Sequence, residues 1–313
     1  MRSIRRDNAR WTVTRVMAGL LIIASICIGG FPTLMQYRSA KELSRISDQS
    51  AMTVAGWPYP KADDALAAAR AYNKRLATSG QPILGEAKDP FSSATGASQA
   101  GGSDSASSND KEYQGLLDTG AGVMGTIRIP KISVELPIYH GTSQSALASG
   151  AGHLYGSSLP VGGDGTHAVI TGHRGLPGAA MFTRLDELRT GDYFYIEVMG
   201  RTLGYKVDRI AVIEPNDTSQ LRIVPGEDRV TLMTCTPYGV NTQRLLVSAR
   251  RSAIPGEIPL EQHAVRDARS IAVGTGAVTL LCGLLPVATG YVRRRSRRTW
   301  GIRRHAAPWP KHA

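Results

Sequence analysis

The sequence predicts a mainly β protein whose core is a closed barrel or a sandwich of seven or eight short strands. From Gly125 onward, short apolar and β-branched runs alternate with Gly, Pro and Asp, and Met199-Gly200 marks a hairpin turn between two of them. Only Ala180–Leu188 has the pattern of a short helix in this region. The expected strands are 126–132, 134–139, 167–171, 193–198, 203–214, 230–235 and 242–249.

Longer helical patterns are confined to the chain before these strands. Residues 36–49 and 61–76 are rich in Ala, Lys, Glu and Arg with spaced apolar positions, which predicts two helices separated by a Trp-Pro-Tyr-Pro segment at 57–60. The stretch Ser92–Asp110 is almost entirely Ser, Gly, Ala and Asp. Such a composition cannot bury a core, so we expect a mobile loop or linker there.

The net charge of +12 belongs to the two ends of the chain. Residues 1–37 and 269–313 together carry +13, whereas residues 38–268 carry −1. The central region therefore lacks the basic surface that suits a phosphate backbone, and we expect no nucleic-acid partner.

Each basic end adjoins an uncharged apolar run, 16–35 in the first case and 271–292 in the second. A helix of that length spans roughly 30 Å, the thickness of the hydrocarbon core of a bilayer. Two transmembrane helices with their basic flanks in the cytoplasm would leave residues 38–268 outside the cell. A cleaved signal peptide is the alternative for the first run.

Cysteine usage singles out Cys235. Cys27 and Cys282 fall in the apolar runs, so Cys235 is alone in the region expected outside the cell, where an unpaired thiol brings no structural benefit. Cys235 ends an apolar strand, and Arg244 follows on a second strand beyond a Pro-Tyr-Gly turn. If the two strands pair as a hairpin, the guanidinium can favour the thiolate and bind a developing oxyanion. The alternative is a buried structural cysteine beside a surface arginine.

Four histidines lie in the strand-rich region, and His173 is the best placed for catalysis. It directly follows an apolar strand, in the same strand-end position as Cys235. His167 falls within or at the start of that strand and is expected to be structural, whereas His140 and His153 lie in Gly-rich loops as catalytic candidates or loop hydrogen-bonders. The spacing shows no close pair of metal ligands and no phosphate-binding loop, so we expect neither a metal nor a cofactor.

Three motifs, in the same order, resemble those of sortases. Thr231–Cys235 resembles their Thr-Leu-x-Thr-Cys signature, Thr171–Gly175 resembles their histidine segment, and Arg244 follows the cysteine at the family's spacing. Further similarity to the pilus-assembling class C sortases is found in Gly125–Ile132, Leu136–Thr142 and Gly152–Pro160, within a dense match over Leu116–Arg251.

This resemblance implies a closed eight-stranded sortase-type β-barrel with short helices, an N-terminal helical and lid segment, and two flanking transmembrane helices. The expected organisation is a basic cytoplasmic tail at 1–15, a transmembrane helix at 16–35, N-terminal helices with a lid and flexible loop at 36–115, the catalytic barrel at 116–252, a linker at 253–270, a second transmembrane helix at 271–292 and a second cytoplasmic tail at 293–313.

Asp89-Pro90-Phe91 resembles the Asp-Pro-aromatic lid that lies over the active site of class C sortases. The resemblance implies that the acid engages the arginine or the thiol while the ring caps the sulfur. The ring here is Phe rather than Trp, which keeps the apolar cap but loses an N–H donor. A plain Asp-Pro turn is the alternative.

The resemblance also implies a transpeptidation. Cys235 would attack the Thr–Gly carbonyl of an LPxTG-like sorting signal, His173 would protonate the leaving amine, and Arg244 would position the substrate and stabilise the oxyanion. A lysine amine of the next pilin would then resolve the thioester. The expected partners are pilin subunits with LPxTG-like sorting signals, the cell membrane, and lipid II or a housekeeping sortase. The alternatives are a sortase of another class, which anchors proteins to peptidoglycan, and a non-catalytic surface module of the same fold.

Overall fold

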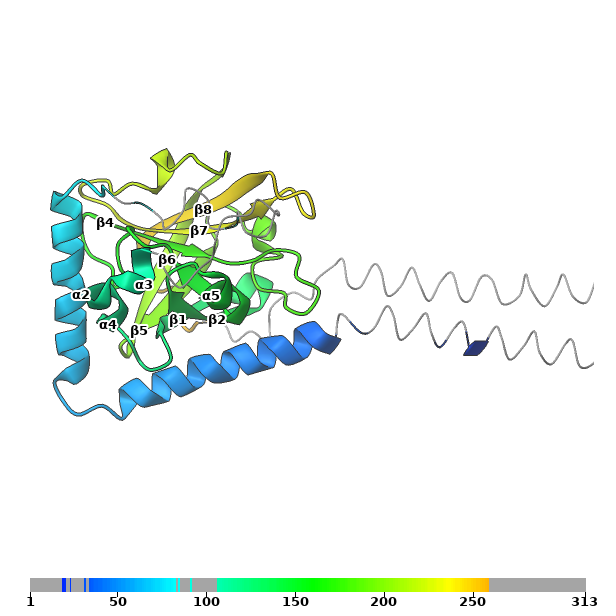
Figure 1. Cartoon of the computed structure of the whole chain (residues 1–313), viewed down its shortest axis with the longest axis horizontal. Helices are drawn as coiled ribbons and strands as arrows, with labels where there is room; N and C mark the ends of the chain where they lie inside the picture. Colours follow the sequence, from blue (N-terminus) through cyan, green and yellow to red (C-terminus); the bar gives the residue numbers. More distant parts are fainter. Residues whose placement is uncertain are drawn as a thin grey trace, which may run out of the picture. The chain divides into compact units, whose positions relative to one another are not determined.

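The computed structural model describes residues 34–82, 84, 91 and 106–258, together with 19, 20, 23 and 31. The chain divides into two compact units, Met1–Ala264 and Val265–Ala313, and every described residue belongs to the first. Eight strands close into a barrel in the order β1-β2-β3-β4-β7-β8-β6-β5 (Figure 1). They are β1 (Val123–Ile129), β2 (Val134–His140), β3 (Ala151–His153), β4 (Thr166–Thr171), β5 (Tyr193–Val198), β6 (Arg201–Ile213), β7 (Asp228–Thr236) and β8 (Gln243–Ser252).

Two parallel pairings determine which strand ends meet. β2 pairs in parallel with β3, and β4 pairs in parallel with β7, whereas the other neighbours are antiparallel. Because parallel strands end at the same edge of a sheet, the ends of β4 and β7 lie side by side although they are distant in sequence. β8 then runs back along β7 as its antiparallel neighbour.

The closed eight-stranded barrel is confirmed, and seven of its strands were predicted. The turn at Met199-Gly200 is confirmed as well, with φ values of 47° and 71°, the positive sign that a two-residue hairpin of this twist requires. The missed strand is β3, whose three residues are too few to show an alternating pattern.

The helix expected at Ala180–Leu188 is wrong. Only the 3-10 turn η3 (Leu185–Glu187) forms there. The backbone is turned out of a helix at Met181, where φ is +38°, and the N–H of Phe182 donates to the carbonyl of His173. The apolar residues of this segment are buried against the barrel core, which explains their helix-like spacing without a helix.

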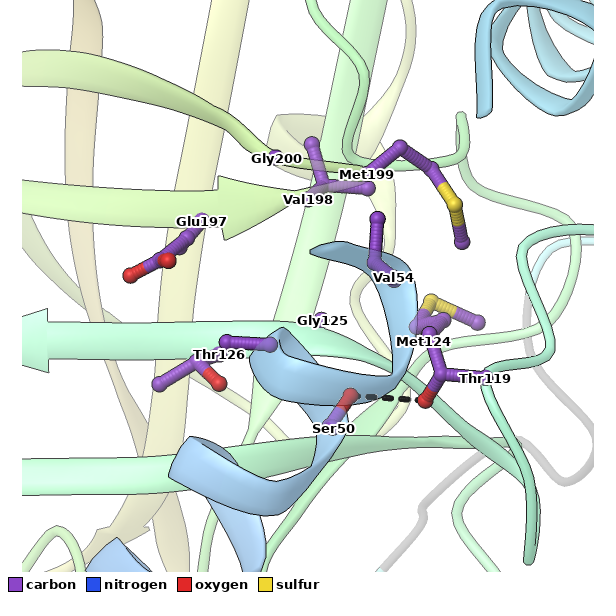
Figure 2. Close-up of a pocket in the computed structure, with 11 residues that line it drawn as sticks. Ser50, Val54, Thr119, Met124, Gly125, Thr126, Glu197, Val198, Met199 and Gly200 are labelled. Carbon is purple, nitrogen blue, oxygen red and sulfur yellow. Dashed lines mark hydrogen bonds between the residues drawn. The ribbon is translucent and has the colours of Figure 1, made fainter. Parts of the chain in front are cut away.

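Two long helices flank the barrel, as predicted, at residues 34–55 and in α2 (Lys61–Thr78) (Figure 1). Both bury side chains in the main apolar core, including Leu43 from the first helix and Leu66 from α2. Figure 2 shows the end of the first helix against the barrel, where Val54 lies between Met124 and Met199. Nearby, the hydroxyls of Ser50 and Thr119 are 2.6 Å apart and share a hydrogen bond.

The remaining helical segments are single turns between the larger elements. The stretch Ser92–Asp110, expected to be a loop, is helical at its end, while residues 92–105 lie outside the described part of the chain. The side chain of Asp110 caps the following turn by accepting from the N–H of Tyr113. The single turns are α3 (Ala106–Asn109), α4 (Lys111–Gly115), η2 (Pro130–Ile132), α5 (Gln144–Ser149) and η4 (Ser219–Leu221), in addition to η3.

The two flanking transmembrane helices are a prediction that the structure corrects. Within the described ranges, no helix combines the length and the apolar composition needed to cross a bilayer. The two long helices that the structure does describe bury apolar side chains in the barrel core. Most of 16–35 and all of 271–292 lie outside the described residues.

Candidate active site

Strand register brings Cys235, His173 and Arg244 to one level of the sheet. Cys235 is the penultimate residue of β7 and pairs directly with Arg244, the second residue of β8. Since directly paired residues project from the same face, the thiol and the guanidinium share one side of the sheet. The sequence suggested that the strands of Cys235 and Arg244 could pair as a hairpin, and they do so as β7 and β8.

His173 reaches this level through the parallel pairing of β4 with β7. Thr171 is the register partner of Met233, and His173 and Cys235 each follow two residues later. The ladder continues past the end of β4, because the N–H of Gly172 donates to the carbonyl of Met233 at 3.1 Å. The hydroxyl of Thr234 donates back to the carbonyl of Gly172 at 2.7 Å. His173 thus lies beside Cys235 on a hydrogen-bonded extension of the sheet.

Gly172 is required by the close approach of an aromatic ring. A Cβ at this position would lie 2.7 Å from the ring of Phe182, which is fully buried. A contact that short cannot occur without displacement of the ring or of the backbone that carries His173. The glycine before the histidine therefore allows Phe182 to pack against the backbone that positions His173.

Cys235 and Phe91 belong to a second apolar cluster, separate from the main barrel core. Cys235 is 5% exposed and Phe91 is 1% exposed. We call this group the site cluster; its buried members are Phe91, Leu147, Leu154, Val169, Ile213, Leu221, Met233, Cys235 and Leu246.

The ring of Phe91 contacts the other two site residues as well. Its centroid lies 5.6 Å from that of the His173 imidazole, with the two planes tilted by 56°. The guanidinium carbon of Arg244 lies 5.3 Å from the same ring, a distance typical of a cation–π contact. Phe91 therefore lies against the imidazole of His173 and the guanidinium of Arg244, in the same apolar cluster as Cys235. Asp89 and Pro90, the other two residues of the expected lid, lie outside the described residues.

Arg244 is held rigidly at the start of β8. Its side chain is 2% exposed, and one terminal nitrogen donates to the carbonyls of Asn241 at 2.9 Å and Gln243 at 2.7 Å. These bonds anchor one nitrogen of the guanidinium, which has five donors, to the end of the β7–β8 loop and the first residue of β8. A guanidinium fixed in this way beside a thiol can bind an oxyanion without reorganising.

Burial lowers the pKa of His173 below its ordinary value, because removing the imidazole from water disfavours its charged form. At neutral pH the neutral imidazole therefore prevails. This form can accept the proton of the cysteine thiol. The side chain stays half-buried, so it remains within reach of a substrate that displaces Phe91.

These observations agree with the comparisons with known proteins. The Sortase domain family model matches residues 127–252. The solved structure of sortase C-1 from Actinomyces oris is 45% identical, covers 62% of this chain and 99% of that one, and superposes with a TM-score of 0.54. The chain belongs to the sortase family. Streptococcus pneumoniae sortase C is 38% identical, with 68% of this chain and 100% of that chain covered and a TM-score of 0.57.

Curated relatives match this sortase over a shorter stretch. Sortase A of Streptococcus agalactiae is 29% identical over 130 residues, which are 41% of this chain and 52% of that protein. Sortase D of Bacillus subtilis is 29% identical over 130 residues, 63% of its length. The match thus spans between half and two thirds of these two relatives. The class C resemblance is confirmed by the solved neighbours, which are sortases C.

The other three barrel histidines of this sortase are not part of the site. His153 is fully buried and donates from Nε2 to the carbonyl of Ser158 at 2.8 Å, while its Nδ1 accepts from the hydroxyl of Tyr113 at 2.9 Å. His140 contacts two backbone carbonyls. His167 contacts the Arg222 carbonyl and the Thr231 hydroxyl. Burial lowers the pKa of both His153 and His167 to about 4.

Hydrogen bonding thus assigns a structural role to all three, including the two that the sequence left open. The described residues also contain no cluster of three or more metal-ligating side chains. The sequence did not single out Arg174, which follows His173 directly and is buried, with bonds to Thr236 and Asp186.

Proposed function

We propose that this sortase is a class C cysteine transpeptidase. It cleaves an LPxTG-like sorting signal between Thr and Gly and joins the new acyl end to a lysine amine of a pilin. The observation that carries the proposal is the meeting of Cys235, His173 and Arg244 on adjacent strands beneath Phe91. These are the three side-chain types that a thiol-based acyl transfer requires.

The first half of the reaction forms a thioester. The neutral His173 takes the proton of the Cys235 thiol, and the sulfur attacks the threonine carbonyl carbon. As the tetrahedral intermediate collapses, the bond from that carbon to the glycine nitrogen breaks, and His173 returns the proton to the leaving amine. Burial favours the neutral imidazole and so supplies the base before the substrate arrives.

The second half returns the enzyme to its starting state. A neutral lysine amine attacks the thioester carbonyl, the carbon–sulfur bond breaks, and His173 passes the proton of the amine to the departing sulfur. The product is an isopeptide bond, and no oxidant, metal or cofactor enters the balance. Arg244 stabilises the oxyanion in both halves, because its guanidinium is already fixed at the level of the sulfur.

We propose that Asp89, Pro90 and Phe91 form a lid. The support comes from Phe91, which is buried among the site cluster and contacts both His173 and Arg244. A sorting peptide and the Phe91 ring cannot occupy this place together. Substrate binding therefore requires Phe91 to leave, and the lid limits access to the thiol until a substrate competes for the site.

The choice of pilin as substrate follows from the solved relatives. One further solved relative is the sortase C1 of GBS pilus island 1, and the structure of the S. pneumoniae sortase C is described as giving insight into pilin substrate specificity. We place the catalytic barrel outside the cell, where such subunits are joined. Transfer of the finished polymer to lipid II would be a later step, taking place either at the Cys235 thioester or on the cysteine of a housekeeping sortase.

A polymerisation assay tests this function. The full chain carrying Phe91→Ala is incubated with a pilin that has an LPxTG-like tail and with a peptidoglycan-type amine, and the products are separated on a denaturing gel. We expect a ladder of covalent multimers that vanishes with Cys235→Ala and with substitution of the acceptor lysine of the pilin. Products joined to a peptidoglycan-type amine in place of a ladder would refute the class C assignment.

A further inference from the structure

We propose that Arg174 is a positioning residue for this transpeptidation, acting by fixing the backbone of His173 against the end of β7. This inference rests on the proposed function. It concerns a residue that lies next to the histidine in sequence but outside the site cluster.

Arg174 connects the segments on which the site is built. One terminal nitrogen of its guanidinium donates to the hydroxyl of Thr236 at 3.3 Å, and Thr236 is the neighbour of Cys235 at the end of β7. The other terminal nitrogen donates to Asp186 in η3 at 2.6 Å. The residue thus links the backbone after His173 to the backbone after Cys235 through one rigid plane.

The same guanidinium reaches the loop that leads to Arg244. Its carbon lies 5.8 Å from the ring centroid of Tyr238 in the β7–β8 loop. That ring also packs against the backbone at Gly175, where a Cβ would lie 3.2 Å away. Arg174 therefore follows His173 in the chain, binds the residue after Cys235, and contacts the loop that leads to Arg244.

Burial makes this role specific to arginine. Arg174 is 8% exposed, and its Nε–H has no hydrogen-bond partner among the described residues. The unsatisfied Nε–H works against stability, whereas the two terminal nitrogens are satisfied by Thr236 and Asp186. Only a planar fork can reach Thr236 and Asp186 at once; a lysine ammonium is a single point and cannot hold both.

Arg184 offers a matched control from the same stretch. It is also largely buried and pairs with a carboxylate of η3, donating from two nitrogens to Glu187 at 3.1 and 2.8 Å. Arg184 and Glu187 are three positions apart in sequence, and another nitrogen of Arg184 donates to the carbonyl of Ile132. Arg184→Lys should thus perturb stability much as Arg174→Lys does without touching Thr236.

The test compares Arg174→Lys with Arg184→Lys in the full chain, each combined with Phe91→Ala so that the thiol is accessible. We expect Arg174→Lys to lower kcat for an LPxTG-like peptide by roughly 30- to 100-fold, the scale of a displacement of about 1 Å between reacting groups. KM should change by less than about threefold, and Arg184→Lys should keep kcat within about twofold. Equal losses in kcat for the two variants, in step with their melting temperatures, would overturn the proposal.

A second readout separates this proposal from the function on which it rests. The pH profile of Cys235 alkylation by iodoacetamide reports whether His173 still faces the thiol, whatever the substrate. Arg174→Lys should shift the profile toward that of a free cysteine peptide, and Arg184→Lys should not; an unshifted profile overturns the positioning role. If the parent chain, with Phe91→Ala alone, does not cleave the peptide although Arg174→Lys shifts the alkylation profile, the proposed function is refuted and the positioning role is not.

If Arg174→Lys fails to fold, Asp186→Asn takes its place. It removes the charge at the partly exposed end of the same link, and the same outcomes decide.

Discussion

Replacing Phe91 by Ala tests how tightly the lid is held over the thiol. The ring is 1% exposed and contacts His173, Arg244 and the site cluster. Truncation of a buried phenylalanine costs about 3–5 kcal/mol. Because Phe91 lies outside the strands and belongs to the proposed lid, we expect this loss to fall on the docking of the lid. About 3 kcal/mol corresponds to roughly a 100-fold rise in the open population.

The assay is the rate of Cys235 alkylation by iodoacetamide at neutral pH. We expect Phe91→Ala to raise the rate by about 100-fold, up to the limit set by a fully open site, and adding Asp89→Ala should raise it no less. Phe194→Ala is the control, since Phe194 is fully buried in the main barrel core and away from the site cluster. It should lower the melting temperature without accelerating alkylation well below that temperature. An unchanged rate in Phe91→Ala would refute the lid.

Three further predictions concern the site and its scaffold. Gly172→Ala forces a Cβ to within 2.7 Å of the Phe182 ring, so it should cost about 1–3 kcal/mol in urea denaturation and lower kcat; unchanged values for both would contradict the packing argument. Arg244→Lys should lower kcat by about 100- to 1000-fold with little change in KM, if the guanidinium binds the oxyanion; a change confined to KM would make it a substrate anchor only. His153 and His167 stay neutral when folded, with pKa values lowered to about 4, but accept a proton near pH 6.5 when unfolded. Stability should therefore fall as the pH drops from about 6.5 toward 4, and His153→Gln should flatten that decline in chemical denaturation; an equally steep decline in the variant would contradict it.

Much of the catalytic geometry could be predicted because it is local in sequence. Cys235 and Arg244 lie on one hairpin, so a turn and two β-branched runs were enough to suggest that they face each other. The placement of His173 beside Cys235 depends on the parallel pairing of β4 with β7. No local pattern encodes a pairing between distant strands; the strand-end position of His173 singled it out, and the family resemblance placed it in one site with Cys235.

The differences between prediction and structure within the barrel come from tertiary contacts that a local sequence pattern does not show. The spacing of apolar residues over Ala180–Leu188 reports burial, and burial against the barrel core produced it without a helix. Similarly, β3 is held by its neighbours on both sides and needs no propensity of its own. Arg174 was missed because its role comes from contacts with Thr236, Asp186 and Tyr238, which lie far from it in the chain.

The central claim is that Cys235 takes an acyl group from a sorting peptide with the help of His173. Mass spectrometry of the full chain carrying Phe91→Ala, quenched in acid after mixing with an LPxTG-like peptide, tests it most directly. Trypsin cuts after Arg229 and Arg244, so Cys235 is carried on the peptide 230–244. We predict that this peptide gains the mass of the acyl fragment ending in threonine, and that the added mass disappears with His173→Ala and when a lysine-bearing pilin is supplied. An unmodified 230–244 peptide while the sorting signal is still cleaved would contradict the account.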